Sequence, residues 1–262
     1  MTIYRYNAES WDEFVHDLRT RSSTWRYRES EATDSDREWS GCRDWNEAIK
    51  FAVEGHPAGR AAIDSAAVKV TMAQEPLWDV APIGAFPCIP AYAAGAPEDM
   101  FTMSDIAPPS PSPIVRIAVN MGAIASIRSQ DIVNRGVAIV SLIDRIQLSG
   151  RRVELIAFTH WGSSLTGDRY LWSVTVKRPE EPIDMDRIGL CFATPIMQRR
   201  FFFRVAEIAT PTDIPGYGFS TQYDDECKQY ELTVPLLTDN VSCSTPDNAV
   251  NTMTRLWAAA AA

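Results

Sequence analysis

The sequence lacks any apolar run of the roughly 20 residues that a helix needs to cross a bilayer. Its first residues, MTIYRYNAESWDE, also lack the basic and apolar regions of a secretory signal. We therefore expect a protein that has no membrane partner and works in the cytoplasm.

Cysteine and histidine are scarce, with five Cys and three His among 262 residues. The cysteines are odd in number, lie singly along the chain and show no Cys-x-x-Cys spacing. This pattern argues against a disulfide framework and a cysteine-rich zinc site, and it is typical of a reducing compartment. No segment carries a strong catalytic signature. We therefore expect no metal and no cofactor, and we favour a non-enzymatic function.

What the chain does have is an ordinary globular composition, with 45% hydrophobic and 10% aromatic residues, which excludes wholesale disorder. Its net charge of −9 argues against a general nucleic-acid coat. The charge is uneven, however, at −8 over residues 1–110, +4 over 111–210 and −5 over 211–262. Either the acidic flanks pair with the basic centre, or the centre contacts an anionic partner.

The first 110 residues predict a helical and irregular N-terminal region that packs on the core. Ser10 and Glu13 have the spacing of a capping box at the start of a helix. Asp44 with Glu47 starts a second helix, which Gly55 ends. An alanine-rich third helix is expected over residues 59–73.

Nine prolines between Pro76 and Pro113 exclude a long helix or a central strand there. Trp78 and Phe86 are among the residues that make this segment too apolar for a free linker. We expect an irregular segment wrapped over the core, ending in a joint at 107–113. The joint separates an N-terminal region, residues 1–110, from a second domain, residues 111–262.

Residues 114–158 have the pattern of a strand, an amphipathic helix and a second strand. Such a βαβ unit makes the two strands parallel. Further elements are expected as strands at 170–176 and 231–236 and as helices at 185–207, interrupted at Pro195, and at 246–257. The sequence therefore predicts an α/β domain with a Rossmann-like, mixed and mainly parallel sheet flanked by helices.

The strand IVRIAV, its small-residue loop, the following helix and the strand RVELIAF resemble the opening of a von Willebrand factor A-type domain. In such domains the loop reads Asp-x-Ser-x-Ser, and its carboxylate and two hydroxyls hold a divalent cation. Residues 120–124 here read Asn-Met-Gly-Ala-Ile, so the resemblance implies a vWA-like fold with a degenerate, metal-free loop. Residues 39–55 and 194–207 are similar to stretches of uncharacterised bacteriophage proteins, which implies a viral setting and no particular reaction.

Polar residues gather where the predicted strands end, which is where open α/β sheets bind ligands. Asn120 closes the first strand, Ser126 follows in its loop, and His160 comes directly after the second strand. Asn120 and Ser126 are candidate partner-binding residues. His160 is a candidate general base or metal ligand, or else a surface residue that makes hydrogen bonds.

Two charged groups further along the chain are the remaining candidates. Asp184 and Asp186 alternate, so they either divide acid and base roles or supply negative charge to a helix N-terminus. Arg199, Arg200 and Arg204 form a basic group in which the last two share a helix face. They either bind an anionic partner or pair with the acidic N-terminal part.

Three functional hypotheses follow. The first is a soluble, non-enzymatic module that binds a protein or nucleoprotein through the strand-end edge and the arginine helix. The second is a metal-dependent hydrolase that uses His160 with Asp184 or Asp186. The third is an accessory factor in viral transcription or replication, whose aromatic residues stack on single-stranded nucleic acid.

Overall fold

A computed structural model describes residues 1–23, 25–26, 28–31, 40–67, 78–81, 86–96, 100–103, 113–211, 213–214, 217 and 219–260. The chain divides into two compact units, of which the larger comprises Met1–Val70 and Ile114–Ala262 and the smaller Thr71–Pro113. The expected boundary near residue 110 lies close to the end of the smaller unit. Residues 1–70, however, belong to the same unit as the α/β region.

A mixed β-sheet, with parallel and antiparallel strands, forms the centre of the larger unit. Its order is β1-β7-β6-β5-β9, and β8 pairs with the end of β6. Parallel pairings join β1 to β7, β6 to β5 and β5 to β9, whereas β7 and β8 run antiparallel to β6. The expectation of a mostly parallel sheet flanked by helices is therefore confirmed. The strands are β1 (Ile3–Ala8), β5 (Ile114–Asn120), β6 (Arg152–Gly162), β7 (Arg169–Lys177), β8 (Phe219–Thr221) and β9 (Leu232–Val234).

The βαβ unit predicted over residues 114–158 is present as β5, helix α6 (Ser129–Leu148) and β6. The two strands pair in parallel from Ile114 opposite Arg152 to Asn120 opposite Phe158. Gly150 follows the helix with a φ of 78°, a left-handed conformation that favours glycine at a helix end.

Like the short strand β8, strand β1 is an element of the sheet that we did not predict. It pairs with β7 in parallel, from Ile3 opposite Arg169 to Ala8 opposite Val174. The N-terminal residues thus complete the sheet, and helix α1 (Trp11–Thr20) then packs against β7.

The expected helix starts are confirmed by their capping bonds. The Ser10 hydroxyl accepts a hydrogen bond from Glu13 N at 3.2 Å, and Asp44 Oδ1 accepts one from Glu47 N at 3.0 Å. These residues cap α1 and α3 (Trp45–Glu54), and Gly55 ends α3 with a φ of 93°. The third helix, α4 (Pro57–Ala67), begins close to its expected start, and residues 68–73 of the expectation lie outside the described ranges.

The helix expected over 185–207 is interrupted near Pro195, as predicted. It consists of α7 (Met185–Phe192), a π-helical stretch η1 (Met197–Phe202) and α8 (Phe203–Ala209). The closing helix is also confirmed, as α10 (Pro246–Ala260), which packs against α6 and β9.

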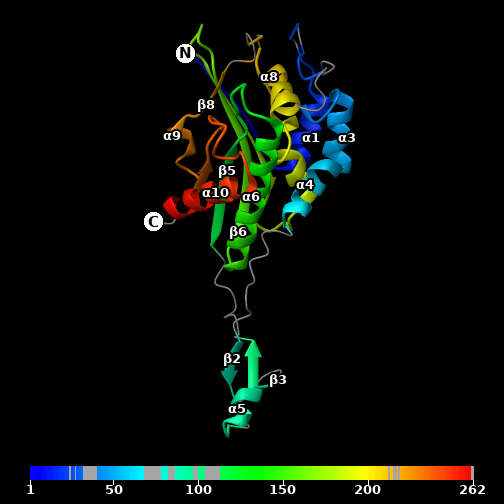
Figure 1. Cartoon of the computed structure of the whole chain (residues 1–262). Coiled ribbons are helices and arrows are strands. Elements are labelled where there is room, and N and C mark those ends of the chain that lie inside the picture. Colours follow the sequence, from blue (N-terminus) through cyan, green and yellow to red (C-terminus); the bar gives the residue numbers. More distant parts are fainter. Residues whose placement is uncertain are drawn as a thin grey trace. The chain divides into compact units, whose positions relative to one another are not determined.

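The sheet is covered on both faces. Its larger core includes Phe14, Ile139, Trp161 and Phe201 and lies under helices α1, α4, α6, α7 and α8. A smaller cluster around Ile156 and Phe158 lies on the other face, beside the short helix α9 (Asp224–Cys227). Figure 1 shows α9 on the opposite side of the sheet from α1, α3 and α8.

The smaller unit is not wholly irregular, which corrects the expectation for its described residues. Strands β2 (Trp78–Ala81) and β3 (Phe86–Pro87) both pair in antiparallel fashion with β4 (Met100–Met103). A short helix, α5 (Ile89–Ala93), lies between β3 and β4. The proline-rich joint lies outside the described residues except for Pro113. Within the described ranges, no helix combines the length and the apolar character needed to span a membrane.

Candidate functional site

Asn120 does not form an open strand-end site, which corrects its expected role in partner binding. The residue is fully buried, because β8 pairs with β6 just beyond the end of β5. Its Nδ2 donates to the Thr221 carbonyl at 3.0 Å, and its Oδ1 accepts from Gly122 N at 2.9 Å. Asn120 therefore holds β8 and its own loop in place. Ser126, in the same loop, is exposed.

His160 is buried on the face of the sheet that carries Phe158. It is 6% exposed, and its ring stacks on Tyr223 with centroids 5.4 Å apart. Its Nδ1 accepts a hydrogen bond from Tyr223 N at 3.1 Å, so the neutral ring carries its proton on Nε2. Burial lowers the pKa of His160 to about 4. The ring is therefore neutral at pH 7, and its low basicity makes it a poor general base.

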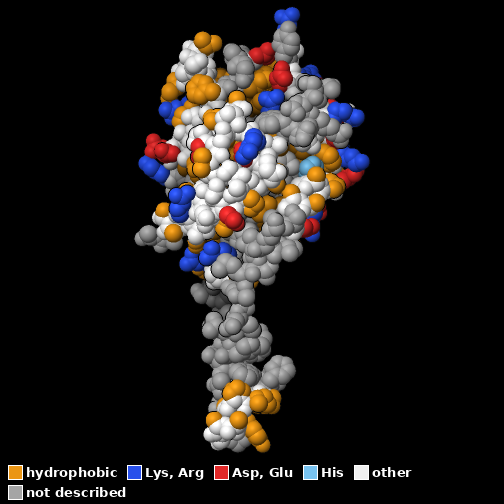
Figure 2. Space-filling model, in the orientation of Figure 1, with side chains coloured by type: hydrophobic (Ala, Val, Ile, Leu, Met, Phe, Trp, Pro, Cys, Tyr) orange, Lys and Arg blue, Asp and Glu red, His pale blue; other side chains and the backbone are white. Residues whose placement is uncertain are grey.

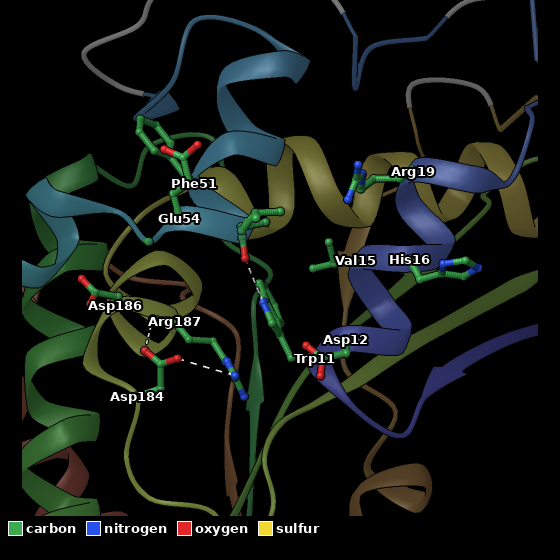
Figure 3. A pocket seen from close by; sticks show the side chains of 13 residues that line it. Trp11, Asp12, Val15, His16, Arg19, Phe51, Glu54, Asp184, Asp186 and Arg187 are labelled. Atoms are coloured by element: carbon green, nitrogen blue, oxygen red, sulfur yellow. Dashed lines mark hydrogen bonds and ion pairs between the residues drawn. The ribbon is translucent and has the colours of Figure 1, made fainter.

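Asp184 and Asp186 lie at the start of α7, in a pocket between α1, α3 and α7 (Figure 3). Asp184 Oδ1 accepts from Arg187 N at 3.0 Å, and its other oxygen lies 3.5 Å from the Arg187 guanidinium. Asp186 lies 3.6 Å from Arg60 Nη1. The helix-capping interpretation is thus confirmed for Asp184.

The structure does not bring these aspartates together with His160. His160 lines a different pocket, of about 250 Å³, with the ion pair of Arg5 and Glu226. That pocket lies on the α9 side of the sheet, whereas the aspartates lie among the helices of the other side. The histidine and the two carboxylates therefore cannot act on one substrate atom in this arrangement.

Arg200 and Arg204 are buried, so they do not form an exposed basic stripe that could bind an anionic partner, which was one of the two alternatives. Arg200 donates to the carbonyls of Glu29 and Arg43, at 3.2 and 3.1 Å. Arg204 Nη1 lies 3.0 Å from Glu31 Oε1. The alternative that these arginines pair with the acidic N-terminal part is confirmed for Arg204.

Exposed basic residues do not replace that stripe on the face shown in Figure 2, where side chains of both signs lie scattered. Arg199 is exposed, with its guanidinium 5.2 Å from the centre of the Phe203 ring. None of the tryptophans whose burial the structure describes is exposed, and Trp161 and Trp172 lie in the core, so they are not available to stack on nucleic acid.

The group that stands out instead is Arg135, which the sequence reasoning missed. It lies in α6 and is 1% exposed. Its Nη1 donates to the carbonyl oxygen of Asn120 at 2.9 Å, whereas its Nε is buried without a hydrogen-bond partner. Within the described part of the chain, no carboxylate forms an ion pair with it. Burial lowers the pKa of Arg135 to about 10, so the guanidinium remains charged at pH 7.

Arg135 lines a cavity of about 390 Å³ at the carboxyl ends of β5 and β9. Its walls come from α6, the segment after β8, the end of β9 with the chain that follows, and α10. The lining residues are Arg135, Gln222, Val234, Pro235, Leu236, Leu237, Thr238, Asp239, Ser242, Cys243, Thr252, Met253, Arg255 and Leu256.

Hydrogen bonds to backbone groups hold the walls of this cavity in place. Leu237 N donates to the Gly122 carbonyl and the Leu237 carbonyl accepts from Ile124 N, both at 3.0 Å. Asn134 Nδ2 donates to the Cys243 carbonyl at 2.9 Å, which fixes the segment before α10 over α6. The cavity is therefore a defined feature of the fold, built where α/β sheets commonly bind ligands.

The polar groups of the cavity suit binding better than reaction. Gln222 Oε1 is buried without a hydrogen-bond partner, like Arg135 Nε. Burial raises the pKa of the Cys243 thiol, which keeps it protonated and poorly nucleophilic at pH 7. Among the described residues, His, Cys, Asp and Glu do not gather into a group that would hold a metal ion.

The sequence did contain a signal for Arg135. It lies three residues after Ile132 and four before Ile139, both of which are buried, so it occupies the apolar face of α6. A charged residue on such a face is rare unless it is paired or bound to something.

The comparisons with known proteins add the family. Neither the curated proteins nor the solved structures include a match to this chain. A family model matches residues 1–257, which is nearly the whole sequence. The chain therefore belongs to the family described as "Domain of unknown function (DUF7192)".

Proposed function

We propose that the chain is a binding module whose ligand carries an anionic group that pairs with Arg135. The observation that carries this proposal is a buried guanidinium that lines a cavity and has no carboxylate partner in the described part of the chain. A buried charge is usually paired, because removing it from water without a partner costs several kcal/mol. A bound anion would offset that cost.

Binding is favoured over catalysis because the acid and base candidates are dispersed. His160, with its lowered pKa, and the two aspartates of α7 line separate pockets. Beside Arg135, the one thiol is protonated because burial raises the pKa of Cys243. A buried guanidinium beside a protonated thiol supports recognition of charge. This agrees with the first of the three hypotheses, a non-enzymatic binding module.

The proposal extends to the finer fold and the setting. The parallel β5–α6–β6 unit supports a vWA-like arrangement. In this arrangement the loop that corresponds to the metal-binding loop is fixed by the hydrogen bonds of Asn120. We also propose that the partner is a protein or nucleoprotein and that the chain is a bacteriophage protein of the host cytoplasm. These two proposals rest on the sequence resemblances alone. Of the residues expected to contact that partner, Ser126 and Arg199 are exposed.

Thermal unfolding of the full chain tests the proposal. The probes are sodium hexanoate, hexyl phosphate and inorganic phosphate, with hexanamide as the uncharged control. An anion at about 100 times its Kd stabilises the folded state by about 2.7 kcal/mol, which raises Tm by about 5–10 °C for a domain of this size.

The matched variants are Arg135→Met and Arg145→Met, which change a buried and an exposed arginine of the same helix. We expect at least one anion to raise the Tm of the wild type and of Arg145→Met but not that of Arg135→Met. If none of the three anions stabilises the wild type, or if Arg135→Met responds equally, the proposed function is wrong.

A further inference from the structure

One nitrogen of the Arg135 guanidinium is left to bind the anion. Nη1 is engaged with the Asn120 carbonyl, and Nε has no partner. Within the described ranges, the structure records no hydrogen bond from Nη2. Nε is enclosed by protein atoms, whereas Nη2 is not, so Nη2 is the donor that Arg135 offers to a ligand in the cavity. A carboxylate oxygen is a suitable acceptor for this charge-assisted hydrogen bond.

Much of the cavity wall around Arg135 is apolar. Val234 at the end of β9 and Leu237 in the chain that follows are buried, and Met253 and Leu256 line the facing side of α10. A volume of about 390 Å³ lies in the range that small-molecule sites of proteins occupy. The ligand therefore has an apolar body in addition to its charged group.

The charges of the lining favour a single negative charge on the ligand. Arg135 and Arg255 contribute two positive charges and Asp239 one negative charge. Hydrogen bonds from Ser242 N and Val241 N lower the pKa of Asp239, so this carboxylate is ionised at pH 7. With a net charge of +1, the lining suits a monoanion better than a phosphate dianion, which Asp239 would repel.

We propose that the cavity binds an aliphatic monocarboxylate, with the carboxylate on Arg135 Nη2 and the hydrocarbon chain between the end of β9 and α10. This inference rests on the proposed function and adds the chemical class of the ligand. Arg255, which is exposed, lies at the solvent side of the lining.

Isothermal titration of the full chain with acetate, butanoate, hexanoate and octanoate tests the class. Each buried methylene contributes about 0.8 kcal/mol, so the affinity rises about fourfold per methylene until the cavity is full. Hexanoate binds with a stoichiometry of one and at least about tenfold more tightly than hexanamide or hexyl phosphate.

Two pairs of variants separate the parts of the site. Arg135→Lys keeps a positive charge but cannot place donors both at the Asn120 carbonyl and at the position of Nη2, and we expect it to weaken hexanoate binding at least about tenfold, while Arg145→Lys does not. Leu256→Asn weakens hexanoate more than acetate, while Leu148→Asn, at a leucine that is 60% exposed on α6, leaves both unchanged. Circular dichroism of each variant confirms that it is folded.

The outcomes distinguish this inference from the function on which it rests. If hexyl phosphate or inorganic phosphate binds more tightly than hexanoate and depends on Arg135, the carboxylate class is wrong and the anion-binding function stands. If acetate and octanoate bind with equal affinity, the inference that the ligand has an apolar body is wrong. If no anion binds the wild type, or if Arg135→Lys binds hexanoate as the wild type does and Arg135→Met is equally unaffected, both proposals fail.

Discussion

A 2.9 Å hydrogen bond from Arg135 Nη1 to the carbonyl oxygen of Asn120 places a buried positive charge at the carboxyl end of β5. The same asparagine uses both ends of its side chain to hold β8 and its own loop. Asn120 thus closes the strand-end edge where the sequence predicted a site, and Arg135 lines a different cavity beside that edge. The cavity lies where the α/β rule predicts a binding site, but its buried charged group comes from the helix after the strand.

The unliganded protein should tolerate the loss of this charge. Arg135→Met removes the cost of burying a guanidinium, and it leaves the Asn120 carbonyl without its donor, which costs about 1–3 kcal/mol. Because the two effects oppose each other, we expect a free energy of unfolding in urea within about 1 kcal/mol of the wild type, or above it. A loss of more than about 3 kcal/mol would instead identify Arg135 as a structural residue.

His160 should make the fold sensitive to acid. Burial lowers the pKa of His160 to about 4, below the value of about 6.5 in an unfolded chain. Between these values the unfolded state binds more protons, so the stability that depends on neutral His160 is lost as the pH falls from about 7 towards 4. The difference corresponds to about 3 kcal/mol.

Urea unfolding at pH 7, 5.5 and 4 measures this dependence. The His160→Gln variant should lose about 3 kcal/mol less than the wild type over this range. The control is His16→Gln, at an exposed position of α1, which should follow the wild type. Parallel curves for the wild type and His160→Gln would show that His160 is not buried as described.

The elements that the sequence predicted well are those whose own pattern decides their structure. The βαβ unit has a continuous apolar strand, a long amphipathic helix and a glycine stop, and α1 and α3 carry their caps at Ser10 and Asp44. Strand β1 was missed although Tyr6 and Ala8 are buried and alternate with exposed residues, because its partner β7 lies far along the chain.

The candidate site was predicted less well for a related reason. The burial of Asn120 depends on β8, a strand of three residues that no local pattern marks. The burial of Arg200 and Arg204 depends on carbonyl and carboxylate oxygens from residues more than 150 positions earlier. A sequence shows that a side chain is charged, but only long-range packing decides whether that charge faces water.

Glu207 should be a major contributor to stability, because it joins that long-range packing. The residue is 1% exposed and accepts hydrogen bonds from Ser30 N at 3.0 Å, Ser30 Oγ at 2.5 Å and the Tyr217 hydroxyl at 2.7 Å. Its ion-pair partner is Arg204, at 3.4 Å. Glu207→Gln leaves a buried guanidinium with less compensation, so we expect a loss of about 3 kcal/mol in guanidinium chloride unfolding.

The control for this prediction is Glu231→Gln. Glu231 pairs with Arg116 at 2.8 Å, but both side chains are more than 40% exposed. Ion pairs with this degree of solvent exposure contribute about 1 kcal/mol or less to the free energy of unfolding. Equal losses for the two variants would contradict the contribution assigned to the buried cluster.

Gly136 should be irreplaceable even by alanine, although it lies within α6 and alanine favours a helix by about 1 kcal/mol. A Cβ at this position would lie 2.6 Å from the carbonyl oxygen of Phe192 and 2.8 Å from the Cα of Ala193. Both are backbone atoms at the end of α7, so the contact is relieved only if the two helices move apart.

We expect Gly136→Ala to lose about 1–3 kcal/mol in urea unfolding, whereas Arg145→Ala, at an exposed position of the same helix, changes stability by less than about 0.5 kcal/mol. An alanine variant as stable as the wild type would mean that α6 and α7 do not approach each other this closely. Because Arg135 is the adjacent residue, the same helix separation would also weaken anion binding in Gly136→Ala.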